Sequence, residues 1–216
     1  MEDSKPYNIP IAIETISAAL SSNIPILSSI YNAYSAFSNH VAHKALRITL
    51  IELSNRLSEL EQYIVRDSLY SDEFKNFSYK VFLKATEEIR TEKLKLFAQF
   101  LAQSVLPSNI GNTDKYLFLE TLDKVNLEQL LFIEMLKGDT IDVDYQNTGW
   151  TGKEDELKNQ GITQERFLFL ADYLTNIGLV SRIEKFKVEE GMLYMWREYF
   201  VSSYGLSFLS YLKTVK

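Results

Sequence analysis

The stretch that decides the fold of the C-terminal part is 163–201, which reads TQERFLFLADYLTNIGLVSRIEKFKVEEGMLYMWREYFV. Its first third carries apolar residues at helical spacing, opens on a threonine that can cap a helix and closes on Gly178. The remainder is rich in β-branched and aromatic residues on either side of an acidic turn that contains a glycine. These patterns predict a helix over 163–176 and a β-hairpin with strands at 179–188 and 192–201 and a turn at 189–191.

The residues before this stretch predict two further helices and a polar segment. A short helix over 116–125 leads to Asn126, which can cap a helix that runs to Lys137 and stops at Gly138. The segment 139–161 is polar and has a short helical pattern at 154–159. The predicted order is helix, short helix, helix and hairpin, followed by a last helix over 204–212. This order resembles that of a winged helix. We therefore expect a winged-helix-like α+β domain with a two-stranded wing.

The N-terminal half predicts long helices that pack on one another. Apolar residues recur in steps of three and four, as in a coiled-coil heptad. One seam ends near Asp67, a second begins after the capping residue Ser71, and a break near 90–92 precedes a third that stops at Pro107. Long helices with one apolar face each, joined by short turns, should pack as an antiparallel hairpin or bundle. The seams are Leu27, Ile30, Tyr34, Phe37, Val41, Leu46, Leu50, Leu53, Leu57, Leu60 and Ile64; then Phe74, Phe77, Val81, Ala85 and Ile89; then Leu94, Phe97, Leu101 and Val105.

The fold class predicted by these patterns is mainly α, in two domains. The polar stretch 108–113 is the expected linker, because it is short and rich in turn-forming residues. It separates a long-helix bundle at 1–107 from the winged-helix-like domain at 114–216.

Composition excludes several classes of function. The chain has 216 residues and no cysteine, which excludes disulfides, thiolate zinc sites, iron–sulfur clusters and cysteine nucleophiles. Its net charge of −6 has the opposite sign to that of a dedicated nucleic-acid binder. The first residues, MEDSK, lack the basic start of a secretory signal, so we expect a cytoplasmic protein.

Four short motifs stand out in the sequence: EKLKLFAQFL at 92–101, FLETL at 118–122, IGLV at 177–180 and YGLSFL at 204–209. They resemble motifs of uncharacterised bacterial proteins related to the Abi-alpha (abortive infection) family. The resemblance implies a role in bacterial defence against phage. It supplies no catalytic residues.

An uncharged run extends from Thr15 to His43. Ten serines and asparagines interrupt it and Pro25 divides it, which disfavours a constitutive transmembrane helix. The same small and hydroxylated residues suit either a tightly packed core or dimer seam, or a helical hairpin that inserts into a membrane. The predicted membrane or oligomer face consists of Ile16, Leu20, Leu27, Ile30, Tyr34 and Phe37.

The expected partner surface lies on the helix at 163–176 and on the wing. Residues 108–180 hold 6 basic and 13 acidic side chains, whereas 181–216 hold 6 basic and 4 acidic ones. A mildly basic wing beside an acidic helix suits protein docking better than phosphate contact. The residues expected to face a partner or nucleic acid are Gln164, Arg166, Arg182, Lys185, Lys187 and Arg197.

No pattern predicts catalysis, a metal or a cofactor. His40 and His43 share a helix face but lack a third ligand, and the aspartates at 139, 142 and 144 do not continue into an EF-hand. Phosphate-binding and nucleophile-elbow motifs are absent from the sequence. The expected function is therefore a non-enzymatic protein-interaction module that binds a protein partner or itself. The alternatives are a membrane-acting effector and a DNA-binding winged-helix regulator.

Overall fold

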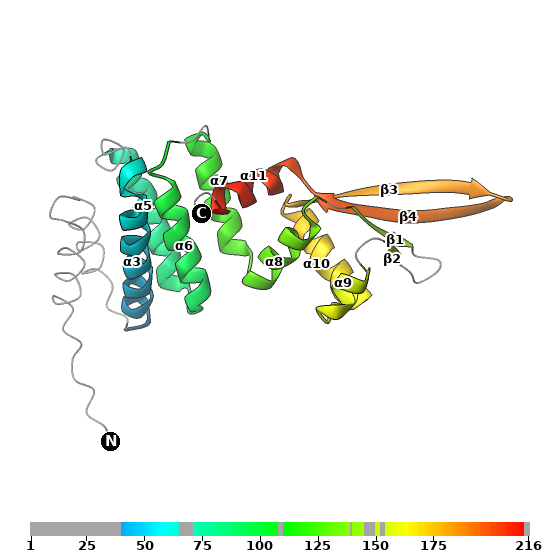
Figure 1. The fold of residues 1–216 in the computed structure, drawn as a ribbon, viewed down its shortest axis with the longest axis horizontal. Coiled ribbons are helices and arrows are strands. Elements are labelled where there is room, and N and C mark those ends of the chain that lie inside the picture. The colour runs from blue at the N-terminus through cyan, green and yellow to red at the C-terminus, as the bar shows by residue number, and fades with distance from the viewer. Residues whose placement is uncertain are drawn as a thin grey trace, which may run out of the picture. The chain divides into compact units, whose positions relative to one another are not determined.

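The computed structural model describes residues 40–64, 71–107, 110–138, 140–144, 150–151 and 154–213. Within them the protein is mainly helical with a small antiparallel sheet, so the predicted mainly α class is confirmed (Figure 1). The chain divides into two compact units, residues 1–124 and residues 125–216.

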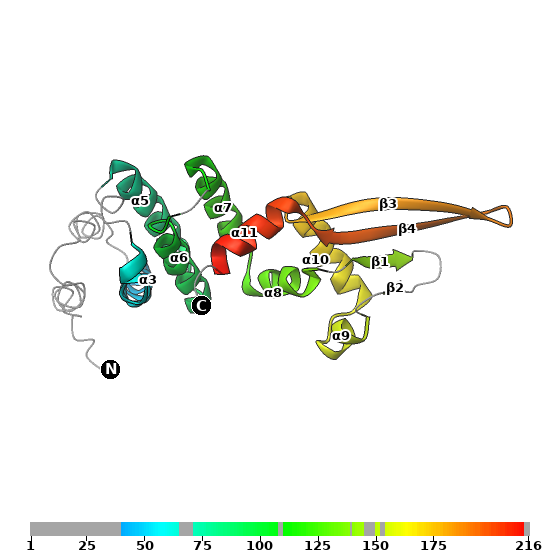
Figure 2. The same ribbon diagram turned by 45° about the horizontal axis from the view of Figure 1, so that its top comes forward.

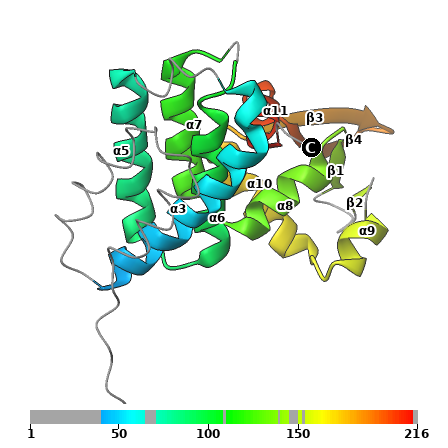
Figure 3. The same ribbon diagram turned by 60° about the vertical axis from the view of Figure 1, so that its left-hand side comes forward.

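Helices that pack through apolar seams form the described part of the first unit. Helix α3 packs against α5 and α6, and α7 packs against α5; Figure 3 views them from the side of α3. Ser71 caps α5 through a hydrogen bond from the Phe74 backbone N–H, as the sequence predicts. The elements are α3 (His40–Leu60), the 3₁₀ turn η1 (Glu61–Tyr63), α5 (Asp72–Glu87), α6 (Thr91–Gln103) and α7 (Asn112–Lys124).

Within the described residues the predicted seams form the core of this unit, except at Val41, Ile89 and the half-buried Ile64; Leu27, Ile30, Tyr34 and Phe37 lie outside those residues. Leu46, Leu50, Leu53, Leu57 and Leu60 of α3 are buried, and so are Phe74, Phe77, Val81 and Ala85 of α5 and Leu94, Phe97, Leu101 and Val105 of α6. The prediction is wrong for Val41 and Ile89, whose exposed fractions are 48% and 78%. Ile89 follows the last residue of α5, so the helical period no longer turns its side chain inward.

The break between α5 and α6 is held by one carboxylate. Glu88 accepts hydrogen bonds from the backbone N–H groups of Ile89 and Arg90, both at 2.9 Å, and two from the Arg90 guanidinium at 2.8 and 2.7 Å. The buried Lys93 ammonium lies 3.7 Å from the same carboxylate and donates to the Asp123 carbonyl near the end of α7. These hydrogen bonds from Arg90 lower the pKa of Glu88 to about 2.

Helix α7 belongs to the first unit, although the sequence placed it after a linker at 108–113. Lys84 of α5 pairs with Glu120 and Asp123 of α7 at 3.1 and 2.7 Å, and the Tyr116 ring meets Phe77 edge-on at 5.1 Å. Contacts between side chains 36 or more residues apart in the chain thus attach α7 to α5. The two units consequently divide between Lys124 and Val125 rather than at 108–113.

The second unit combines helices with a four-stranded antiparallel sheet in the order β2-β1-β4-β3. Strand β1 pairs with β4 over residues 196–199, and β3 pairs with β4 along the whole hairpin. The outer half of the hairpin therefore extends beyond β1 (Figure 1). The elements are α8 (Leu127–Leu136), β1 (Ile141–Asp144), β2 (Trp150–Thr151), α9 (Glu154–Asn159), α10 (Gln164–Asn176), β3 (Val180–Glu189), β4 (Met192–Val201) and α11 (Ser203–Lys213).

The helix ends of this unit follow their sequence signals. Asn126 and Gln129 form a reciprocal capping box at the start of α8, and Thr163 caps α10 through the Arg166 backbone N–H. Helix α10 ends in a Schellman motif around Gly178, whose φ of 81° is left-handed. The predicted hairpin is confirmed. The prediction for 139–161 is incomplete, because this polar segment contains β1 and β2.

Two of the motifs behind the family resemblance meet in one contact. Gly205, at the start of α11, lies so close to the start of β3 that an added Cβ would stand 2.2 Å from the Leu179 carbonyl oxygen and 2.9 Å from Val201 Cγ1. The Ser202 hydroxyl donates to the Gly178 carbonyl and accepts from the Gly205 N–H. Figure 2 shows α11 leaving the end of β4 at the base of the hairpin. Motifs 177–180 and 204–209 are therefore parts of one packing arrangement.

We predict that Glu88→Gln lowers stability at neutral pH and lowers it less at pH 3. The folded pKa of Glu88 lies below its ordinary value of 4.5, so its stabilisation is present above that pH and is lost as the pH falls toward about 2. The expected difference is roughly 1–3 kcal/mol at pH 7. Urea denaturation of the full chain at pH 7 and pH 3 measures it. A difference between wild type and variant that does not shrink at pH 3 would contradict the assignment.

We predict that Gly205→Ala destabilises the second unit by about 2–3 kcal/mol, because the new methyl group would overlap the Leu179 carbonyl. Gly111→Ala is the control, since its Cβ would meet Asp114 Oδ2 at an ordinary 3.8 Å. Thermal unfolding followed by circular dichroism compares the two variants. Equal melting temperatures for both would show that α11 can move away at little cost.

Candidate functional site

The cations predicted to face a partner or nucleic acid are all engaged by carboxylates of their own unit. Arg166 on α10 forms a bidentate pair with Glu128 on α8, with N–O distances of 3.0 and 2.6 Å. The other pairs are Arg182 with Asp172 at 3.1 Å, Arg197 with Glu184 at 3.1 Å, Lys187 with Glu189 at 2.8 Å, and Lys185 with Glu198. Each carboxylate offsets the positive charge that would otherwise attract a phosphate group of a nucleic acid.

The structure does not bring the six predicted residues onto one face. Paired residues of a hairpin share a face and successive residues alternate, so Arg182 and Arg197 lie on one face and Lys185 and Lys187 on the other. Arg166 and the half-buried Gln164 lie on α10 instead. The predicted surface is therefore three separate sets of side chains.

An apolar surface lies at the outer end of the hairpin, on the face that carries Arg182 and Arg197. The sequence patterns did not predict it. Two adjacent cross-strand pairs, Phe186 with Met195 and Val188 with Leu193, form it. Their exposed fractions are 58%, 37%, 71% and 55%, in that order. These four residues are called the hairpin patch below. On the opposite face, each of the four pairs from Glu189–Met192 to Ile183–Glu198 contains one charged and one uncharged residue.

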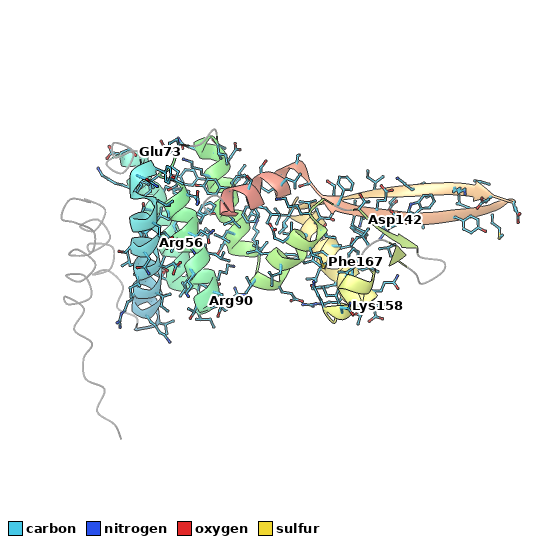
Figure 4. All side chains as sticks on the ribbon, in the orientation of Figure 1. Arg56, Glu73, Arg90, Asp142, Lys158 and Phe167 are labelled. Carbon is cyan, nitrogen blue, oxygen red and sulfur yellow. The ribbon has the colours of Figure 1, made fainter. Side chains whose placement is uncertain are left out.

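The hairpin patch lies on the same face of the hairpin as the buried Tyr199, which joins β4 to the core. This residue lies on the same face of β4 as Leu193 and Met195 and is fully buried. Its ring meets Phe167 of α10 edge-on at 5.6 Å, and its hydroxyl donates to Asp172 Oδ1 at 3.0 Å. Figure 4 labels Phe167 where α10 lies beside the sheet. The Glu184–Arg197 ion pair lies on this face between Tyr199 and the patch.

The tip of the hairpin is acidic and tightly turned. Glu190 and Gly191 both have positive φ, 50° and 79°, as a two-residue type I′ turn requires. Glu189 precedes them at the end of β3. A carboxylate at the end of the hairpin disfavours insertion of the tip into lipid, because burying a charged group in hydrocarbon costs several kcal/mol.

Asp142 and Glu198 form a pair of carboxyl groups on the face opposite to the hairpin patch. They are cross-strand neighbours of β1 and β4, and Asp142 is labelled in Figure 4. Burial raises the pKa of Asp142, the charge of Glu198 raises it further, and Lys185 opposes both effects. Its Oδ1 atom is buried and has no hydrogen-bond partner among the described residues. Asp142 therefore takes up a proton more readily than an ordinary aspartate.

A cavity of about 90 Å³ lies in the first unit between α5 and the start of α7. Lys115 and Glu73 are among its lining residues, and Lys115 donates to the Ser104 carbonyl at 3.3 Å. Burial lowers the pKa of Lys115, and Glu73 opposes that effect. The cavity is much smaller than ligand pockets of about 300–1,000 Å³, so it admits only a few water molecules.

The remaining predicted residues yield no further site in the described part of the chain. The predicted membrane or oligomer face, Ile16, Leu20, Leu27, Ile30, Tyr34 and Phe37, lies outside the described residues. None of the described helices has both the length and the apolar composition needed to cross a bilayer. In the same residues no group of three or more His, Asp or Glu side chains is placed to hold a metal ion.

Comparisons with known proteins add no assignment: no protein-family model, curated protein or solved structure matches the chain. The resemblance to the Abi-alpha family therefore stays a prediction.

We predict that the full chain does not bind duplex DNA more tightly than about 100 μM at physiological salt, because the cations of the hairpin and of α10 are paired within the protein. Fluorescence anisotropy of a labelled duplex, titrated at low and at physiological salt, measures it. Tight binding whose affinity falls steeply with salt would show instead that phosphates displace these carboxylates.

Proposed function

We propose that the protein is a non-enzymatic protein-interaction module and that the β3–β4 hairpin is its contact element. One observation carries this proposal. The hairpin patch places four large apolar side chains in solvent on a strand register that the buried Tyr199 holds in place. Exposed apolar side chains that adjoin one another on a rigid element are typical of surfaces that bind another protein.

The second unit is, in this proposal, a winged-helix-like domain whose wing is the β3–β4 hairpin. The order α8, β1, β2, α9, α10, β3, β4 supports this, because β1 pairs with the last strand in the position that a winged helix gives its first strand. The fold alone does not indicate a ligand, since winged helices and other common folds carry unrelated functions.

Protein binding has more support than nucleic-acid binding. A DNA reader gains most of its affinity from cations that neutralise phosphates. Here the corresponding cations are paired with carboxylates, and Glu189 and Glu190 lie at the tip. Large apolar side chains at the end of the wing instead lose unfavourable contact with water when a protein covers them.

Bacterial defence is the biological setting that we propose, and its support is the sequence resemblance alone. An interaction module in such a system would act in the cytoplasm by binding a component of the phage, of the host or of the system itself. Phage plating efficiency on cells with and without the protein tests the setting separately from the contact element.

We predict that the double variant Val188→Ser/Leu193→Ser loses partner binding while Ile183→Ser/Met192→Ser retains it. Each variant removes two exposed apolar side chains from the same hairpin, but only the first removes them from the hairpin patch. Proximity labelling in the host with the full chain compares the two. A partner enriched by the wild type should fall about tenfold or more with the patch variant. Equal enrichment by both variants would contradict the proposal.

A further inference from the structure

The hairpin patch has a shape and composition that restrict what can cover it. It is two residue pairs long and free of charged side chains between its four members. It is bounded on the core side by the Glu184–Arg197 ion pair and on the outer side by Glu190 in the turn. An occupant must therefore offer an apolar surface of similar length without a carboxylate opposite Glu190.

A second copy of the same hairpin meets this requirement. Two sheets pack face to face at about 10 Å with their strands nearly aligned, so a twofold axis can relate two copies of the patch. If the two hairpins ran tip to tip, Glu190 would face Glu190 and the carboxylates would repel. If they ran tip to base, Glu190 of each copy would lie at the level of the Glu184–Arg197 ion pair of the other, because Glu190 and Arg197 are both about three positions from the centre of the patch. The tip-to-base arrangement is therefore favoured, because it replaces the repulsion between two Glu190 carboxylates with contact to an ion pair that contains a guanidinium group.

The area of the patch is sufficient for a weak dimer. Exposed fractions of 37–71% correspond to roughly 100 Å² per side chain, hence to roughly 400 Å² on each copy. Both copies together bury roughly 800 Å², and the Glu190–Arg197 contacts at the two ends bring the total close to the roughly 1,000 Å² of small specific interfaces. Weak and transient contacts typically bury areas at this low end, so we expect a weak dimer with a dissociation constant on the order of micromolar.

We propose that the hairpin patch is a self-association surface that packs tip to base on the same patch of a second copy of this chain. The inference rests on the proposed function, since it names one partner for the same contact element. It commits to a symmetric contact between β-sheet faces, in which Phe186, Val188, Leu193 and Met195 of each copy cover those of the other.

Sedimentation of the full chain over a range of concentrations tests the proposal. The wild type should show a concentration-dependent dimer in the micromolar range, roughly 1–100 μM. Val188→Ser/Leu193→Ser should raise the dissociation constant at least tenfold, and the matched control Ile183→Ser/Met192→Ser should change it by less than about threefold. Circular dichroism of each variant verifies that it folds. A wild type that stays monomeric, or a dimer that both variants weaken equally, would overturn the proposal.

Cross-linking identifies the face that the two copies share, because the chain has no cysteine of its own. Leu193→Cys places a single thiol near the centre of the patch, and Met192→Cys, equally exposed at 55%, places one on the opposite face. A short bifunctional maleimide should link Leu193→Cys into dimers and leave Met192→Cys monomeric. Efficient linking through position 192, or none through position 193, would overturn the proposed contact.

The two proposals can fail separately. A protein that is monomeric in sedimentation but still labels a host protein through a contact sensitive to Val188→Ser/Leu193→Ser would overturn self-association and support the interaction module. A dimer that the patch variant leaves intact would overturn the self-association proposal and leave proximity labelling to decide the proposed function.

Discussion

The burial of Tyr199 is the constraint on which the functional surface depends. Its ring packs edge-on against Phe167, and its hydroxyl donates to Asp172, which also accepts from Arg182. Side chains alternate along a strand, so a tyrosine held inward at position 199 sends every second residue of β4 to the same face. A shift of the register by one residue would bury a different set and turn the hairpin patch to the other side. The core of the second unit thus determines what a distant and solvent-exposed part of the hairpin presents.

Ion pairs determine the chemistry of that surface as much as the apolar residues do. The carboxylates of Glu184, Glu189 and Glu198 each lie beside one hairpin cation, and Asp172 pairs with Arg182 at its base. Exposed pairs of this kind contribute little to stability, because water screens the attraction between the two charges. Their consequence is electrostatic, because they leave a hairpin with little residual positive charge. What distinguishes the outer end of the hairpin is then its apolar area.

Local signals in the sequence predicted most helices and the hairpin, while contacts between distant residues decided the rest. The helix caps at Ser71, Asn126 and Thr163 bond to backbone groups within four residues, so the sequence alone predicts them. Strand β1 was missed because Ile141 and Val143 alternate over only four residues and gain their order from pairing with β4, more than 50 residues later. The assignment of α7 and the pairing of Arg166 with Glu128 likewise depend on residues that the chain brings together only on folding. The hairpin patch can be predicted only when the strand register is known, because charged or aromatic residues separate its four members in the sequence.

The length of the hairpin has a consequence for how this domain can diverge. Its outer half extends beyond β1 and contributes no buried residue, so insertions and deletions there leave the core unchanged. Adding two residues to each strand would lengthen the arm and keep every outer side chain on its present face. Adding one residue to each strand would also preserve the pairing but would exchange the two faces, and the apolar set would then point the opposite way. Among descendants of this sequence, selection on a face-specific contact would therefore tolerate changes of hairpin length in even steps and remove the odd ones.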